Sequence, residues 1–201
     1  MSMNTVPERL AALRAAMAAN GVAVYLIPVG DPHASEYLPC HYTSLTWFSG
    51  FHGENSNFVV TRTESALWAD GRYFVQAEKE IAGTEIKLQR MGEPGVPTVE
   101  EYCANALNEG EALGLCGLTA STALVNGLKK ALEKKGASIK TLNLEDELWT
   151  EGRPPVPATP AWMLTKDQAG LSVREKLAAV REKLAAQKAG AMLVTRLDSV
   201  A

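Results

Sequence analysis

The chain has 201 residues, enough for one large domain or for one domain and part of a second. Apolar residues make up 46% of the sequence and charged residues 21%, a balance that supports a folded core and excludes a disordered chain. Twenty Lys and Arg against 23 Asp and Glu give a formal net charge of -3. Because such a surface does not attract a phosphate backbone, we expect no nucleic-acid partner.

Neither a membrane span nor a secretory signal is expected. The longest apolar runs, such as residues 21–29, are much shorter than the roughly 18 to 20 residues that cross a bilayer. The first ten residues, MSMNTVPERL, lack a basic segment followed by an apolar core. The sequence therefore predicts a cytoplasmic protein that does not contact a membrane.

The first elements are a helix and a buried strand. Thr5 and Glu8 form a capping box before an apolar series that ends at residues 20–21, which predicts an amphipathic helix. Residues 22–28 are continuously apolar and rich in branched and aromatic side chains, as in a strand that is covered on both faces. A helix that leads into such a strand predicts an α/β layer.

Strands and helices continue to alternate along the chain. Further strands are expected over residues 57–61, 65–69, 85–90, 112–116 and 138–142. Further helices are expected to begin at Asp70, Thr98 and Ser121, where a capping side chain precedes an apolar series. This order of elements predicts an α/β fold with a mixed or parallel sheet and helices on its faces.

The last part of the chain is predicted to repeat the first. Residues 152–160, GRPPVPATP, indicate an extended linker because proline lacks a backbone donor. Ser172 and Glu175 then form another capping box before a helix, and a strand is expected over residues 191–195. This unit copies the opening helix and strand in order and nearly in length. We therefore expect a domain over residues 1–151, a proline-rich linker over 152–170, and the incomplete start of a second, repeated domain over 171–201.

The cysteines predict neither a disulfide nor a zinc site. Cys40, Cys103 and Cys116 are odd in number, widely spaced and outside any CxxC pair. Each is expected to be a small, buried, apolar residue.

One polar segment collects several side chains of the kinds that bind metals. They are Asp31, His33, Glu36, Cys40 and His41. Prolines at positions 32 and 39 place this segment in turns, where no helical spacing brings the side chains to one point. We therefore expect no metal site, and we expect Asp31 to hold loop amides instead.

Two further motifs contain candidate functional residues. In FSGFHGEN, residues 48–55, glycines on both sides of Phe51 and His52 favour a structural turn over a ligand loop. In WADGRYF, residues 68–74, Arg72 is expected at the exposed start of a helix, where the macrodipole disfavours a cation. Arg72 therefore needs an anionic partner, either an acidic side chain or a ligand carboxylate. No motif of a catalytic nucleophile is found.

Four segments carry a resemblance to a known family. They are LIPVGDPHASEYLP, WFSGFHGENS, LWADGRYFVQAE and ELWTEGRPPVP. In this order they resemble the amino-terminal domain of the three-domain Xaa-Pro aminopeptidases (aminopeptidase P), a domain of the creatinase/prolidase N-terminal family. Residues 171–201 similarly resemble the opening of the second domain of these enzymes, a structural repeat of the first.

The resemblance implies a mixed sheet with helices on both faces, and a metal-dependent hydrolase that removes the residue before a proline. In these enzymes a carboxy-terminal pita-bread domain holds two divalent ions, commonly manganese, by two Asp, one His and two Glu. That domain is absent from this sequence, so neither a catalytic residue nor a metal ligand is expected here. The implied partners are the enzyme's own catalytic domain, peptides with proline in second position and a second copy of the chain in a homodimer.

The resemblance also implies roles for two residues. Arg72 matches the arginine of the family's DGR motif and is expected, with His52, at the substrate entrance. The loop GFHGENS departs from the family's common GFxGSAG. A different class of function remains open, in which the chain is a stand-alone creatinase-type domain that binds a peptide or protein through residues 31–41 and 48–55.

Overall fold

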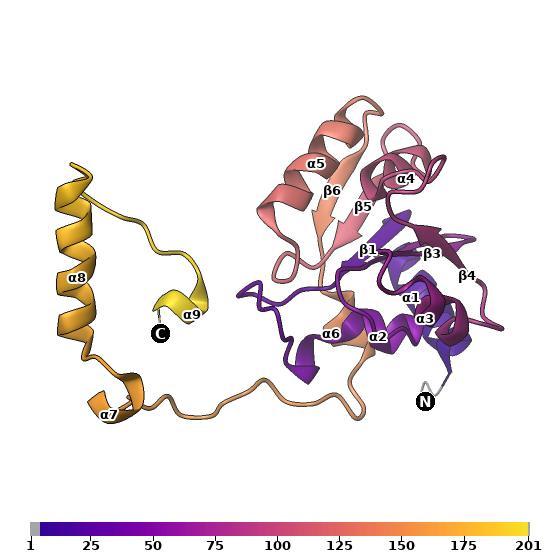
Figure 1. Ribbon diagram of the computed structural model, residues 1–201. Coiled ribbons are helices and arrows are strands. Elements are labelled where there is room, and N and C mark those ends of the chain that lie inside the picture. The colour runs from indigo at the N-terminus through magenta and orange to yellow at the C-terminus, as the bar shows by residue number, and fades with distance from the viewer. Residues whose placement is uncertain (1–4, 201) are drawn as a thin grey trace. The chain divides into compact units, whose positions relative to one another are not determined.

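The computed structural model describes residues 5–200, apart from the side chains of residues 197 and 198 (Figure 1). The chain divides into two compact units with the boundary between Val156 and Pro157. We call them the N-terminal unit and the C-terminal unit and describe each by itself. Among the helices of residues 5–200, none is long and apolar enough to cross a bilayer.

A six-stranded sheet in the order β4-β3-β2-β1-β5-β6 forms the centre of the N-terminal unit. Its strands are β1 (Val24–Pro28), β2 (Asn57–Thr61), β3 (Ser65–Ala69), β4 (Ile86–Arg90), β5 (Ala112–Leu115) and β6 (Ser138–Thr141). β2 runs antiparallel to β1 and β3, whereas the other neighbouring pairs are parallel. Every strand except β2 therefore points in the same direction, and the sheet is mixed.

Helices cover both faces of this sheet. The first face carries α1 (Val6–Ala19), α2 (Ser44–Ser49), α3 (Phe74–Glu80) and α6 (Leu144–Leu148). The second face carries α4 (Val99–Asn105) and α5 (Thr122–Glu133) (Figure 1). Neighbouring residues of a strand point to opposite faces, so Tyr25 packs in the first core and Val24 in the second. This architecture confirms the predicted fold class.

Helix α1 forms where its local signals predict it. The Thr5 hydroxyl accepts a hydrogen bond from the Glu8 amide at 3.4 Å, and the Glu8 carboxylate accepts one from the Thr5 amide at 3.0 Å. Its apolar face, with Leu10 no more than 1% exposed, packs on the sheet. From the same helix, Arg14 donates to the carbonyl of Thr61 at 3.0 Å and forms an ion pair with Glu85. Both contacts fix the helix to the strands.

The central strand β1 is buried along its whole length. In its parallel pairing with β5, Tyr25 lies opposite Gly114. A Cβ atom at position 114 would lie 2.8 Å from the Tyr25 ring. The tyrosine therefore crosses β5 only because its neighbour is a glycine.

The C-terminal unit contains α7 (Lys166–Ala169), α8 (Val173–Ala186) and α9 (Leu197–Val200). Helix α8 matches α1 in length, and its capping box of Ser172 and Glu175 is formed as predicted. Its apolar stripe is uncovered, however, since Leu177 is 46% exposed where Leu10 of α1 is 1% exposed. Local signals thus form the helix although the described residues of the C-terminal unit do not bury its apolar stripe.

Two expectations, for a strand and for a cysteine, are wrong. Residues 191–195 do not form the predicted strand, because the described part of the C-terminal unit offers no neighbouring strand for their backbone groups. Cys40 is exposed, because it begins a short 3-10 helix (Cys40–Tyr42) on a surface loop. The other two cysteines, Cys103 and Cys116, are buried as predicted. Burial is the main cause that raises the pKa of the Cys103 thiol.

Candidate functional site

A cleft of about 750 Å³ lies where β1, β3 and β5 end. Because these strands run in the same direction, the loops after them meet at one edge of the sheet. The cleft is lined by residues of the segments 28–38, 54–57 and 117–124 and by Arg72. In open α/β sheets, ligands bind outside the carboxyl ends of the strands. We therefore take this cleft as the candidate site.

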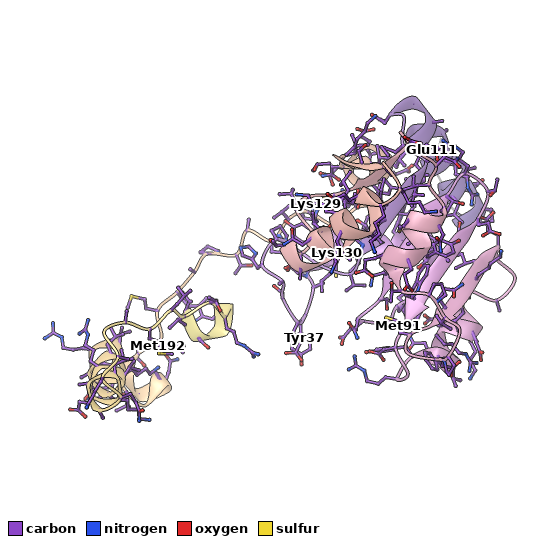
Figure 2. All side chains as sticks on the ribbon, turned by 90° about the horizontal axis from the view of Figure 1, so that it is seen from above. Tyr37, Met91, Glu111, Lys129, Lys130 and Met192 are labelled. Carbon is purple, nitrogen blue, oxygen red and sulfur yellow. The ribbon has the colours of Figure 1, made fainter. Side chains whose placement is uncertain are left out.

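The loop after β1 is held by Asp31. Its Oδ1 atom accepts hydrogen bonds from the amides of His33 at 2.9 Å and Ser35 at 3.0 Å, as the sequence predicts. At its start, Gly30 approaches the loop after β5 closely, since a Cβ atom would lie 2.6 Å from the carbonyl oxygen of Thr119. Tyr37, 81% exposed, lies at the tip of the loop and points away from the body of the unit (Figure 2).

Arg72 occupies a turn and not the first turn of a helix, which corrects the expectation for this motif. Helix α3 begins at Phe74, and Asp70 does not cap it. The Asp70 carboxylate is engaged by Arg72 instead, through its amide at 2.9 Å and through its guanidinium Nη2 at 2.6 Å. The anionic partner that we expected for Arg72 is thus an acidic side chain two residues earlier. Even so, the Arg72 side chain is 65% exposed at the cleft.

Asp70 connects Arg72 to the loop before β2. Asn55, whose φ of 45° lies in the left-handed region, donates from Nδ2 to Asp70 Oδ2 at 2.9 Å. The hydrogen bonds from Arg72 are the main cause that holds the pKa of Asp70 far below its usual range. Hydrogen bonds from its side chain to Asp70 in turn raise the pKa of Arg72. The pair is therefore ionised at neutral pH, and its exposed guanidinium is a cation at one wall of the cleft.

His52 lies in a second hollow of about 170 Å³ beside the cleft. The two hollows share the side chains of Glu36, Leu38 and Glu54. The His52 side chain is 68% exposed, and its Nδ1 atom lies 3.5 Å from the carboxylate of Glu80 at the end of α3. The structure therefore brings both predicted entrance residues to one side of the sheet, in adjoining hollows.

The glycines around His52 serve the fold. Gly50 ends α2 with a φ of 79°, in the left-handed region that favours glycine. At Gly53, a Cβ atom would lie 2.1 Å from the buried Phe51 ring. The ring of Phe51 occupies the space that a side chain at position 53 would need. This packing agrees with the structural turn that the sequence favoured.

Several polar side chains of the cleft are engaged within their own loops. In residues 5–200, no three side chains of His, Cys, Asp or Glu converge so that they could hold a metal ion. His41, a member of the polar segment, instead bonds through Nδ1 to the carbonyl of Pro154 at 2.8 Å. The lining of the cleft includes neither histidine nor cysteine, and the Ser121 hydroxyl caps α5. The arrangement can bind and orient a polar ligand.

Asn55 and Glu54 contribute to the site and were not singled out from the sequence. For Asn55 a recognisable signal was present, because asparagine in a tight loop tolerates left-handed backbone angles and bonds nearby groups. Its partner Asp70 could not be identified from that signal, since the two residues lie on different loops.

The family of the chain follows from comparison with known proteins. The model of the creatinase/prolidase N-terminal domain matches residues 9–148, and a second model with the same description matches residues 152–201. The chain belongs to the creatinase/prolidase N-terminal domain family.

Individual proteins similar to this chain are Xaa-Pro aminopeptidases. The probable Xaa-Pro aminopeptidase P of Sordaria macrospora is 38% identical over 204 residues, which cover 100% of this chain and 33% of that protein. Aminopeptidase P2 of Arabidopsis thaliana is 36% identical over 98% of this chain and 28% of its own length. The chain thus spans about a third of the curated relatives that it matches.

A solved structure agrees with the sequence comparison. The X-prolyl aminopeptidase of Caenorhabditis elegans, described as a cytosolic enzyme with a di-nuclear active site, is 33% identical. The match has a TM-score of 0.78 and covers 92% of this chain and 32% of that one.

Proposed function

We propose that this chain is the non-catalytic amino-terminal part of an Xaa-Pro aminopeptidase, a metal-dependent hydrolase that removes the residue before a proline. The observation that carries the proposal is a match over essentially the whole chain to such enzymes, at 36–38% identity but only 28–33% of their length. The bond-breaking step then belongs to the part of the longer enzymes that this match does not cover.

The metal ions belong to that other part as well. The related C. elegans enzyme has a di-nuclear active site, whereas residues 5–200 of this chain place no three ligand-type side chains around one point. This donor set does not fit a metal pair, so we derive no catalytic step here. In the complete enzyme we propose two divalent ions, manganese by family resemblance, in a catalytic domain that is the first partner of this chain.

The cleft has the chemistry of a substrate entrance. Its lining contains one cation, Arg72, and the carboxylates of Glu36 and Glu54. Charges of both signs suit the charged amino and carboxyl ends of a short peptide. The Arg72 side chain is 65% exposed, and its partner Asp70 also accepts a hydrogen bond from Asn55. In our proposal Arg72 orients the peptide and His52 lines the approach to it.

The two units would then be the first domain, residues 1–151, and the start of a second, repeated domain, residues 171–201, joined by the linker 152–170. The agreement between α1 and α8 supports this division. Both helices have 14 residues and a capping box, and both are followed by a residue with positive φ, Gly21 and Lys188. We further propose a cytoplasmic homodimer.

The decisive experiment compares Arg72→Ala with Arg62→Ala in a longer enzyme that contains this chain. The two arginines are matched, since Arg62 is 60% exposed and pairs with Glu111 away from the cleft. Loss of a charged contact of about 1.5–3 kcal/mol should lower kcat/KM for a Xaa-Pro peptide about 10- to 150-fold for Arg72→Ala only. Equal kinetics for both variants would refute the entrance role of Arg72.

A second measurement separates this function from a stand-alone binding module. The 201-residue chain alone should neither hydrolyse Xaa-Pro peptides nor bind them tightly, because the contacts to the reacting bond are missing. Tight, saturable binding of such peptides to the chain alone, abolished by Arg72→Ala, would favour the binding module.

A further inference from the structure

A carboxyl group is buried on α6, away from the cleft. Glu145 is only 3% exposed, although glutamate is seldom buried without a cation beside it. Its carboxylate contacts the phenol oxygen of Tyr25, which crosses from the central strand over Gly114. The hydrogen bonds at this oxygen show which protonation state the fold accepts.

The Tyr25 hydroxyl faces three polar groups but carries one hydrogen. Its oxygen lies 3.1 Å from the amide nitrogen of Leu144, 3.0 Å from the carbonyl oxygen of Leu142 and within hydrogen-bond distance of Glu145 Oε2. The amide can only donate and the carbonyl can only accept. If Glu145 is ionised, two acceptors compete for a single phenolic hydrogen, and one buried acceptor loses its bond.

A proton on Glu145 satisfies every member of the cluster. The carboxylic acid then donates to the Tyr25 oxygen, the Leu144 amide donates to the same oxygen, and Tyr25 donates to the carbonyl of Leu142. A phenol oxygen that accepts two hydrogen bonds and donates one has used its full capacity. We propose that Glu145 is held as a neutral carboxylic acid and acts as a proton-dependent latch for the segment that leaves the N-terminal unit.

The surroundings of Glu145 favour the neutral form. Burial is the main cause that raises the pKa of Glu145 to about 7, and the neighbouring Asp146 carboxylate acts in the same direction, whereas the hydrogen bond with Tyr25 and the charge of Arg153 act against it. Cys116, after β5, and His41 line the same small cavity of about 170 Å³. Arg153, the cation at this cavity, is already paired with Asp146. On α1, which packs against α6, Arg9 lies over the Trp47 ring.

Glu145 is the first of several contacts that hold residues 143–156, which we call the exit segment. The Trp149 amide bonds to the carbonyl of Glu145 at 2.9 Å, and its ring stacks on Trp47 at 5.5 Å. Arg153 donates from Nε to the carbonyl of His41 at 3.2 Å, and His41 Nδ1 donates to that of Pro154 at 2.8 Å. Loss of the proton from Glu145 places a buried charge under α6, breaks the hydrogen-bond arrangement at Tyr25 and loosens this segment just before the boundary between the units.

Infrared spectroscopy of the full chain tests the protonation state. At pH 6, where exposed carboxyl groups are ionised, the protein should show the carbonyl band of one carboxylic acid, and that band should disappear with a midpoint near pH 7. Glu145→Gln should remove the band, whereas Glu147→Gln, an exposed residue of the same helix, should keep it. The imidazole of His41 has no such absorption. Absence of the band at pH 6 in the wild-type chain would overturn the proposal without reference to any variant.

Near-ultraviolet circular dichroism of the Trp47–Trp149 stack tests the latch. Its signal should change with the same midpoint as the infrared band in the wild-type and Glu147→Gln proteins. In Glu145→Gln, which keeps a neutral hydrogen-bonding side chain, the signal should stay constant from pH 6 to pH 8. A wild-type signal that remains constant while the band disappears would overturn the latch.

Discussion

The substitution Gly53→Ala tests how the loop beside the cleft is built. A Cβ atom at this position would lie 2.1 Å from Cζ and 2.6 Å from Cε1 of Phe51, far inside van der Waals contact. Phe51 cannot move aside easily, since its ring is fully buried in the core under α2 and contacts Tyr73 edge-on at 6.1 Å. The alanine must therefore shift either the core ring or the backbone of the loop.

The expected cost is that of overpacking a well-filled core, about 1–3 kcal/mol. For a protein of this size that corresponds to a fall in Tm of about 2–12 °C, measurable by thermal or denaturant unfolding. Gly71→Ala is the matched control, because Gly71 also lies in a motif of the candidate site, but a Cβ atom there would have nothing within 4 Å. We expect a change of less than about 0.5 kcal/mol for Gly71→Ala.

Phe51→Leu tests whether the Phe51 ring causes the cost of Gly53→Ala. Leucine lacks the Cζ atom that causes the closest approach, so Gly53→Ala should cost at least about 0.5 kcal/mol less in a protein that already carries Phe51→Leu than in the wild type. If the cost of Gly53→Ala is the same in both proteins, or equal to that of Gly71→Ala, the ring contact does not explain why position 53 is a glycine.

Three further predictions concern stability. Leu10→Ala should cost about 2–5 kcal/mol in denaturant unfolding, whereas Leu177→Ala, at the corresponding place of α8 and 46% exposed, should cost less than about 0.5 kcal/mol; similar costs would mean that α8 is covered. Arg14→Met, which keeps the apolar stem but loses the bonds to Thr61, Ser65 and Glu85, should lower the free energy of unfolding by about 1–3 kcal/mol. If the free energy of unfolding does not change, apolar burial alone holds α1 on the sheet. The pKa of Glu145 is raised from 4.5 to about 7 in the folded protein, so its contribution to stability is fully present below pH 4.5 and is lost as pH rises through 7. Over these roughly 2.5 pH units, at about 1.4 kcal/mol each, the wild type should lose up to about 3.5 kcal/mol relative to Glu145→Gln. If the free energy of unfolding changes with pH in the same way in both proteins, the pKa of Glu145 is not raised.

The sequence predicted all six strands of the sheet and the capped helices α1, α4, α5 and α8, but it missed the short helices α2 and α6 and placed one strand wrongly, at residues 191–195. Helices α1 and α8 show where local signals suffice. The signals of a helix lie within a few residues, so Ser172 and Glu175 cap α8 even though its apolar stripe is exposed. A strand needs a partner from elsewhere in the chain. Residues 22–28 and 191–195 look alike in sequence, but the first segment pairs with β2 and β5 while the second has no neighbour within the described C-terminal unit.

In the candidate site, contacts within one motif could be predicted from the sequence, and contacts between loops could not. Arg72 needed an anion, and Asp70 lies two residues away in the same motif. The start of α3 was misplaced because Asp70 is also held by Asn55, a contact between two loops that no local pattern contains. Burial of Glu145 was missed for the same reason. The run LEDEL looks like an exposed polar turn, and only Tyr25, 120 positions earlier, provides its buried partner.

The opposition of Tyr25 and Gly114 in the parallel pair of β1 and β5 has a consequence for evolution. The ring can cross β5 only while position 114 lacks a Cβ atom, which would lie 2.8 Å away. A relative that acquires a side chain at position 114 must therefore lose the aromatic ring at position 25, and with it the phenol that contacts the carboxyl of α6. Variation at positions 25, 114 and 145 should be correlated across the family, so that the three identities change together or not at all.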